Sequence, residues 1–270
     1  MVASSLSISR AWDETRDIFQ RDGKLLIAVA LALIVLPEVV AGLIAPPETS
    51  ATAAASGGVQ LLRLAVGLIS LVGQLALIRL ALGPSTTVGA AIGHGARRFP
   101  AVFGAILLLV LALAVPLSII LVALGVDPQH LTQLSPAASF VILLFGLAAL
   151  ALSVKFTMVS PVGSAEAVGP IAILKRSWNL TSGHYLRLLG FIALLLVATL
   201  VLMIVAGVVG GLLARVVSPT IEPMSLGALL LSLCAGTAQG VFSILASVML
   251  ARVYAQLAGA APATAAGQAR

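Results

Sequence analysis

The sequence predicts an all-α integral membrane protein, with six transmembrane helices and two or three amphipathic helices at the membrane surface. Of its 270 residues, 60% are hydrophobic and 9% are charged, whereas about a quarter of the residues in a soluble domain are charged. Six apolar runs each hold about 20 residues or more, enough to cross a hydrocarbon core of about 30 Å as helices. Amphipathic segments precede the first, third and fifth of these runs.

Proline, glycine and short polar segments separate the predicted spans. The spans cover residues 25–45, 59–82, 101–124, 138–160, 185–213 and 225–251. We expect a single membrane domain over residues 1–256, followed by a flexible Ala- and Gly-rich tail over residues 257–270.

The amphipathic segments cover residues 7–21, residues 85–100 and a helix that begins at Pro170 and stops at Ser182-Gly183. Each is expected to lie flat in the membrane surface with its apolar face toward lipid. In the third segment this face carries Ile171, Leu174, Trp178 and Thr181, and the opposite face carries Lys175, Arg176 and Asn179.

The order of amphipathic helix, span, loop and span occurs three times. The units cover about residues 7–83, 85–160 and 165–252, and all three would enter the membrane from the same side. This pattern favours a three-fold pseudo-repeat of parallel units. The alternative is that any two-span unit with a basic start has this hydropathy profile.

The distribution of cations predicts the orientation. Of the fifteen Lys and Arg residues, all but Arg63 and Arg215 fall on the side of the two termini. By the positive-inside rule, both termini are expected in the cytoplasm. The cations are scattered over short loops, so the net charge of +6 does not indicate nucleic-acid binding. The sequence does not identify a protein partner.

Glu38 is the one acidic residue well inside a predicted span. A charge there costs a few kcal/mol on insertion scales, so it should face protein or water and find a partner. Arg63, at a similar depth in the next span, is the expected partner. We favour an ion pair that clamps the first two spans, and the alternative is a proton or cation site. Gln74 and Gln239 either join neighbouring helices or line a polar cavity, and the former is more common.

The aromatic and basic residues of the amphipathic segments form a second candidate site, for anionic lipid headgroups on the cytoplasmic side. The alternative, which we favour, is plain anchoring and topology. The residues are Trp12, Arg97, Arg98, Lys175, Arg176, Trp178 and Arg187. Nearer the span ends, Arg79, Lys155 and Arg252 are expected to extend their charged groups toward water.

No catalytic set is visible, and the histidines lie in separate loops or junctions without a second ligand at metal spacing. We therefore expect no enzyme activity, no metal and no cofactor. Two glycine pairs, Gly207 with Gly211 and Gly236 with Gly240, are expected to let the fifth and sixth spans approach each other closely.

Residues 161–189 resemble the bacterial membrane-domain family that is fused ahead of glycerophosphoryl diester phosphodiesterases. The matching residues are Pro161, Glu166, Gly169, Pro170, Arg176, Ser177, Trp178, Leu180, Thr181 and Gly183. The segment ARVYAQL, residues 251–257, resembles the close of that family. The resemblance implies a six-span protein of the inner membrane with interfacial helices. It implies no chemistry, because the membrane domain is not the catalytic part of those fusions.

Two functions follow from these features. The leading hypothesis is a non-enzymatic multi-pass protein of the inner membrane that organises lipids or partner proteins through its basic surface belt. The alternative is a small-solute or ion transporter or channel that uses the polar residues around Glu38. A continuous wet cavity that reaches Glu38 would favour transport, and a dry, closed bundle would count against it.

Overall fold

The computed structural model describes residues 7–45, 57–83, 87–126, 135–218 and 221–259, and every regular element in these ranges is a helix. Six helical stretches are long and apolar enough to cross a membrane, which confirms the predicted all-α membrane class. The polar loops at 46–56 and 127–134 and most of the predicted tail lie outside the described residues.

The first membrane stretch joins α1 (Ile8–Ala30), the π-helix η1 (Leu31–Val35) and α2 (Leu36–Ile44). The remaining helices are α4 (Gly57–Leu82), α5 (Val88–Ala123), α6 (Pro136–Phe156), α7 (Val159–Ala165), α8 (Pro170–Thr181), α9 (Tyr185–Val217) and α10 (Leu226–Leu257).

Only the third amphipathic segment forms a helix of its own. The first is continuous with the span that follows it, from Ile8 to Ile44, and the second lies within the 36 residues of α5. The prediction of separate helices was wrong for these two, because the helix continues through both junctions, past Gly23 in α1 and Pro100 in α5. By contrast, α8 ends at Ser182, and Gly183 follows with φ of 93°, a left-handed conformation that glycine adopts without strain.

Small and polar residues face the protein in all three amphipathic segments, joined by one isoleucine in the first and one in the third. The buried positions are Ala11, Thr15 and Ile18 in α1, Ala91 and Gly95 in α5, and Ile173, Ser177 and Thr181 in α8. Trp12, Ile171 and Trp178 are 52%, 62% and 42% exposed. The apolar face predicted for each segment is therefore only partly buried. Small side chains make the close helix contacts, and large ones such as Trp12 and Trp178 lie on the outer surface of the protein.

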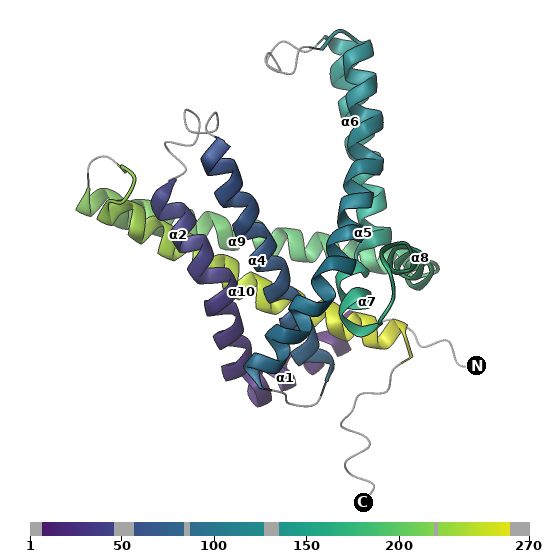
Figure 1. Ribbon diagram of the computed structural model, residues 1–270, viewed down its shortest axis with the longest axis horizontal. Coiled ribbons are helices and arrows are strands. Elements are labelled where there is room, and N and C mark those ends of the chain that lie inside the picture. The colour runs from purple at the N-terminus through teal and green to yellow at the C-terminus, as the bar shows by residue number, and fades with distance from the viewer. Residues whose placement is uncertain (1–6, 46–56, 84–86, 127–134, 219–220, 260–270) are drawn as a thin grey trace, which may run out of the picture.

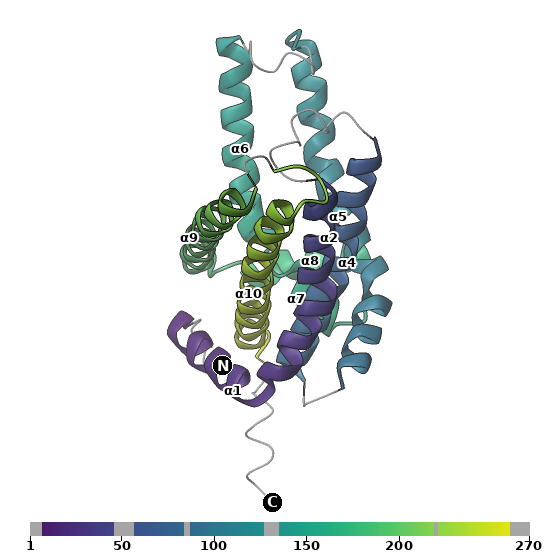
Figure 2. The same ribbon diagram turned by 90° about the vertical axis from the view of Figure 1, so that its left-hand side faces the viewer.

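Three helix pairs, α2 with α4, α5 with α6 and α9 with α10, run in different directions from a shared packed region (Figure 1). We call the end of the molecule where α1 begins and α10 ends the basic end, and the other the opposite end. The main core lies at the basic end, where α7 and α8 meet residues of the spans such as Leu75, Phe191 and Met249. Figure 2 shows α5 and α6 extending beyond the other helices toward the opposite end.

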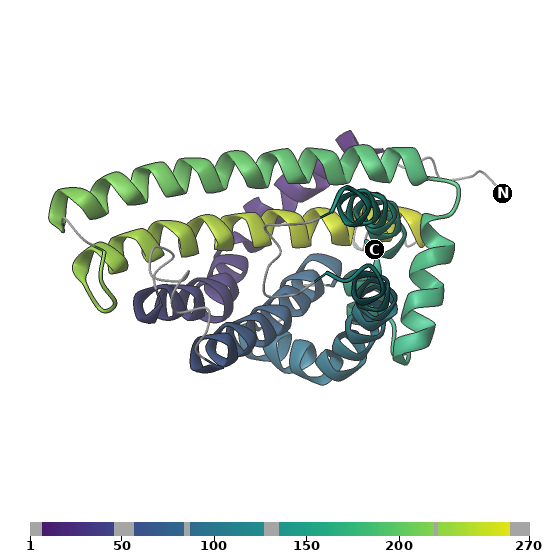
Figure 3. The same ribbon diagram turned by 90° about the horizontal axis from the view of Figure 1, so that it is seen from above.

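Glycines set the helix contacts, although not where the sequence predicts. α9 and α10 lie side by side (Figure 3), and Gly210 makes the close approach, because a Cβ there would lie 3.0 Å from Cys234 Cβ. Gly207 and Gly211 face open space. Gly236 and Gly240 instead approach Val35 and Val39 of the first stretch, so they join α10 to η1 and α2 rather than to α9.

Side chains close the ends of helices at the basic end. The carbonyl of Lys155, in the last turn of α6, accepts hydrogen bonds from Ser177 Oγ at 2.9 Å and Thr181 Oγ1 at 3.2 Å. The carbonyl of Ser164, in the last turn of α7, accepts one from His94 Nε2 at 2.8 Å. Unpaired helix carbonyls are costly away from water, so these bonds fix α8 and α5 against the fourth membrane stretch.

The residues that carry the family resemblance form one structural joint. Glu166 Oε1 accepts hydrogen bonds from Arg176 Nε at 3.0 Å and from the Tyr254 hydroxyl at 2.8 Å, which ties α8 to α10. Pro161 is buried within α7, and Gly169 caps the start of α8. The motif therefore has a packing role, and Tyr254 explains why the segment ARVYAQL belongs with it.

We predict that Gly95→Ala destabilises the protein by about 1–3 kcal/mol, the range of an overpacked contact. The new methyl group would lie 2.6 Å from the Val72 carbonyl oxygen, so α5 would have to move away from α4. Gly93→Ala is the matched control, because it gains the same helix propensity and meets nothing within 4 Å. Thermal unfolding in detergent measures both, and equal midpoints would contradict the prediction.

Candidate functional site

The four polar residues predicted inside the spans line one cavity. It lies between α2, α4 and α10 and has a volume of about 650 Å³. Glu38 comes from α2, Arg63 and Gln74 from α4, and Gln239 from α10. Ser70 and Ser232 add two hydroxyls, and the other lining residues are Ala41, Gly42, Ala45, Val66, Gly67, Leu231 and Ala235. The sequence analysis expected Glu38 to lie beside Arg63 and gave a polar cavity as the less common alternative for the two glutamines, but it favoured helix contacts over a shared cavity.

The π-helix η1 leads directly into the Glu38 wall of the cavity. Pro37 lacks the N–H that would bond back along the helix, and the chain before it widens into a π-turn in which the Leu36 N–H donates to the Leu31 carbonyl. Such turns are rare and are often found at functional sites. The sequence analysis missed this turn, and Pro37 in the middle of a span was the available signal.

Close helix contacts show how deep each polar residue lies along the helices. A Cβ at Gly73 would lie 3.0 Å from Leu33 Cβ, and one at Gly240 would meet Val35 Cγ2. The neighbouring residues Gln74 and Gln239 are therefore level with η1, below Glu38 as seen from the opposite end. The two glutamines form the floor of the cavity, and Ala45 and Arg63, close to the helix ends, lie at its mouth.

Below this floor the same three stretches are packed together. Apolar residues from α1, α4 and α10 form a continuous buried cluster that includes Leu26, Leu77 and Val248. In α4, residues 75–78, 80 and 81 are all at most 1% exposed. Within the described residues, the cavity thus extends from the opposite end to about the middle of the helices and is closed toward the basic end.

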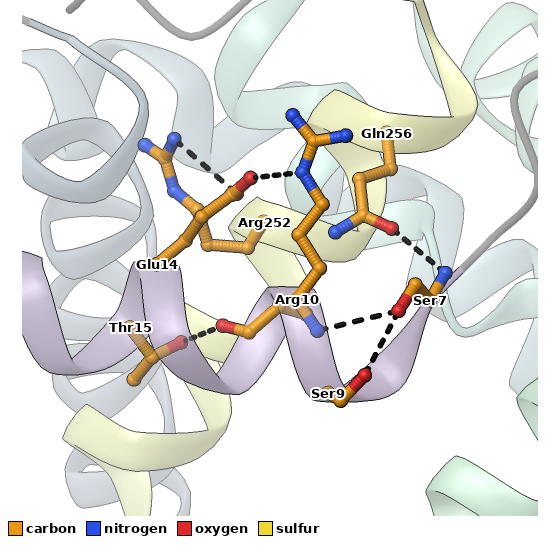
Figure 4. Close-up of polar contacts among 8 residues, drawn as sticks. Ser7, Ser9, Arg10, Glu14, Thr15, Arg252 and Gln256 are labelled. Atoms are coloured by element: carbon orange, nitrogen blue, oxygen red, sulfur yellow. Dashed lines mark hydrogen bonds and ion pairs between the residues drawn. The ribbon is translucent and has the colours of Figure 1, made fainter.

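A polar contact between α1 and α10 completes this closure (Figure 4). Glu14 lies between Arg10 Nε at 3.0 Å and Arg252 Nη1 at 3.9 Å. Arg252 Nη2 also donates to the carbonyl of Ala81, in the last turn of α4, and Gln256 Oε1 accepts from the Ser7 N–H at 3.0 Å. We call the Glu14–Arg252–Ala81 contact the basic-end latch. Arg252 is only 9% exposed, so the expectation that it extends toward water was wrong.

The predicted interfacial residues do not gather in one place. Lys175 and Trp178 line a shallow hollow of about 360 Å³ with Phe156, Leu174 and Asn179. Lys155 Nζ lies 5.1 Å from the centre of the Trp178 ring.

The others are spread over four helices. Trp12 is exposed on α1, and Arg97 Nε donates to the carbonyl of Gly93 on α5, beside Arg98. Arg176 of α8 belongs to the Glu166 joint, and Arg187 lies in the first turn of α9. Of the residues predicted to bind lipid headgroups, Lys175 and Trp178 therefore line the same hollow, and the others do not line it.

A family model described as "Domain of unknown function (DUF7847)" matches residues 6–257. The chain belongs to this family. No curated protein and no solved structure matches it. Nothing in the match links the DUF7847 family to the membrane domains of glycerophosphoryl diester phosphodiesterases, so that resemblance does not establish membership.

The convergence of the cavity residues leaves a signal in the sequence. Leaving aside Val66 and Leu231, the lining residues of α4 follow each other at intervals of three or four, at 63, 67, 70 and 74, and those of α10 do so at 232, 235 and 239. Each of these sets is a polar or small stripe on one helix face. A search for such stripes would have found Ser70 and Ser232, which single-residue reasoning missed.

We predict that the cavity is wet. In a Cys234→Ala background, Gly67→Cys should react with a membrane-impermeant maleimide, because a thiol ionises and reacts only where water reaches it. Leu64→Cys, one turn away on α4 and 56% exposed outside the cavity lining, is the matched control and should stay unreactive in lipid. Equal labelling of both, or of neither, would contradict a wet cavity.

Proposed function

We propose that this protein is a non-enzymatic multi-pass membrane protein that binds a small polar solute in the cavity and carries it across the membrane. The observation that supports the proposal most strongly is that one carboxylate, one guanidinium, two amides and two hydroxyls from three spans line one half-enclosed cavity. Ionisable residues inside spans are costly, and the default interpretation of such residues is functional.

The size and place of the cavity fit this role. A volume of about 650 Å³ lies within the range of small-molecule sites, roughly 300–1,000 Å³. Secondary transporters bind their substrates near the bilayer midplane, where structural repeats meet. Here α2 and α4 belong to the first predicted unit and α10 to the third. The Glu38–Arg63 ion pair that the sequence favoured stays a prediction, and it is compatible with a ligand that separates the two charges.

We further propose that the protein lies in the bacterial inner membrane with its basic end in the cytoplasm. The cations of α1, α8 and the ends of α4 and α10 support this orientation. The cavity would then open to the outside, and delivery to the cytoplasm would require the basic-end latch to open.

A retention assay tests the proposal. Purified protein is equilibrated by dialysis against a pool of amino acids, amines, organic acids, sugars and nucleosides, and the retained solutes are identified by mass spectrometry. We expect the wild type to retain at least one solute tenfold more than a Gln74→Leu/Gln239→Leu variant that elutes as the same folded species. Equal retention by both proteins would overturn the proposal.

The latch generates a separate prediction. Ser243 is 3% exposed below the cavity floor, so Ser243→Cys in the Cys234→Ala background should be protected from maleimide. Adding Glu14→Gln removes the carboxylate from Arg252 and should raise cytoplasmic-side labelling several-fold. Asp13→Asn, an exposed neighbouring change of the same kind, is the control and should have no effect. If Glu14→Gln leaves labelling at the control rate, the latch does not hold the basic end closed.

Recognition of anionic lipid is a second candidate function, favoured by the hollow that Lys175 and Trp178 share. A Trp12→Phe variant leaves Trp178 as the one tryptophan of the chain. We predict that brominated phosphatidylglycerol quenches its fluorescence more than brominated phosphatidylcholine does, because a cation near the surface is worth about 1 kcal/mol toward anionic lipid. Lys175→Gln should reduce this preference, and identical quenching by the two lipids would exclude it.

A further inference from the structure

One buried hydroxyl below the cavity floor has no hydrogen-bond partner among the described residues. It belongs to Ser243 of α10, which is 3% exposed. Other helix hydroxyls, such as those of Thr15 and Thr199, donate to a carbonyl of their own helix at 2.7 Å. The Ser243 hydroxyl makes no such bond. A buried polar group without a partner is costly, so its presence requires an explanation.

Ser243 belongs to a polar stripe that begins in the cavity. Gln239 lies on the cavity floor, and Ser243 and Ser247 follow it at intervals of four, on the same face of α10. Ser247 is 4% exposed. The stripe therefore continues from the floor toward the basic end, through the part of the bundle where the cavity is closed.

The stripe lies between two hydrophobic clusters. The cluster that α10 shares with α1 and α4 includes residues 244, 248 and 251, and the main core includes residues 249, 253 and 254. At about 100° per residue, Ser243 and Ser247 fall between these two sets, and Tyr254 lies on the same face two turns beyond Ser247. A path along the stripe can therefore open where the two clusters meet, without exposing the interior of either.

The neighbouring helix presents apolar side chains at this depth. The α4 face that carries Gln74 in the cavity continues with Leu77, Ile78 and Ala81, all at most 1% exposed. α4 and α10 both run from the cavity toward the basic end, so Ser243 and Ile78, each four residues beyond a floor glutamine, lie at about the same depth. In the closed protein the Ser243 hydroxyl therefore lies in apolar surroundings.

We propose that Ser243 and Ser247 form an inner binding site, which the solute occupies after it leaves the cavity floor and before it leaves at the basic end. This inference rests on the proposed function, because it names the route of the same solute. A hydroxyl both donates and accepts hydrogen bonds, so the inner site can replace the bonds that Gln74 and Gln239 offer at the floor. The unpaired hydroxyl is then explained, since it gains a partner only when the basic-end latch is open.

Cysteine labelling of the purified full chain tests the route. In a Cys234→Ala/Glu14→Gln background, Ser243→Cys and Ser247→Cys lie on the stripe. Ile244→Cys and Val248→Cys are matched controls at the same depth, since all four native side chains are at most 6% exposed. We expect 2-(trimethylammonium)ethyl methanethiosulfonate to react at least tenfold faster on the stripe than at the controls.

The solute pool of the retention assay tests whether the path is also a binding site. Added to the same labelling reactions, the pool should slow the stripe cysteines several-fold, because a bound solute excludes the reagent. Equal rates at all four positions would mean that the basic end unfolds, and faster controls would place the path on another face. Either result, an unreactive stripe or a stripe that the pool does not protect would overturn the inner site.

Thermal unfolding tests the unpaired hydroxyl independently of the latch. Ser243→Ala should raise the unfolding midpoint more than Ser118→Ala does. Both changes gain the same helix propensity, but Ser118 Oγ donates to the Val115 carbonyl at 2.8 Å, whereas Ser243 loses no bond. A midpoint for Ser243→Ala equal to or below that of the control would indicate a structural role for the hydroxyl and overturn the inference.

The outcomes separate this inference from the proposed function. If the retention assay finds a solute while the stripe stays unreactive or unprotected, the inner site fails and the proposed function stands. If no solute is retained, the proposed function fails, and the inner site fails with it whatever the labelling rates.

Discussion

Helix ends that lie away from water must find partners for their last carbonyls, and at the basic end other elements provide them. Arg252 of α10 reaches the carbonyl of Ala81 in α4, Ser177 and Thr181 of α8 reach that of Lys155 in α6, and His94 of α5 reaches that of Ser164 in α7. A carbonyl left unpaired in apolar surroundings would cost several kcal/mol. These bonds fix how the helix pairs converge, and the rest of the architecture depends on that convergence.

Convergence at one end allows the helix pairs to diverge at the other. Glycine contacts hold α10 against η1 and α2 from Gly240 up to Gly42, which faces Ser232, and the polar cavity lies between these helices and α4. The two halves of these helices therefore have different roles. Their halves near the basic end supply packing and closure, while their halves near the opposite end supply the groups that a solute would meet.

Hydropathy was sufficient to predict the six membrane stretches, and Pro170 and Gly183 were sufficient to place α8. The cost of polar groups in lipid identified Glu38, Arg63 and the two glutamines one by one. That Gln239 joins Glu38 and Arg63 at one cavity could not be predicted, because it depends on α10 packing beside α2, a contact between segments that are far apart in the chain. Local patterns also failed to show which face of each amphipathic segment packs on protein. Ile18 and Ile173 are buried, but most of their buried neighbours are alanine, glycine, serine or threonine, which score weakly as apolar residues and allow close approach.

The π-helix between α1 and α2 determines the rotational phase of the first membrane stretch. Each residue of a regular helix turns by about 100°, and a π-turn accommodates one additional residue without breaking the helix. The stripe that packs Ile18 and Leu26 and the stripe that presents Glu38 therefore follow separate phases. Loss of a single residue from this turn would preserve the hydropathy of the stretch and yet rotate Glu38 off the cavity wall. Among members of the family, the spacing between Leu26 and Glu38 is consequently as informative as the identity of the acid itself.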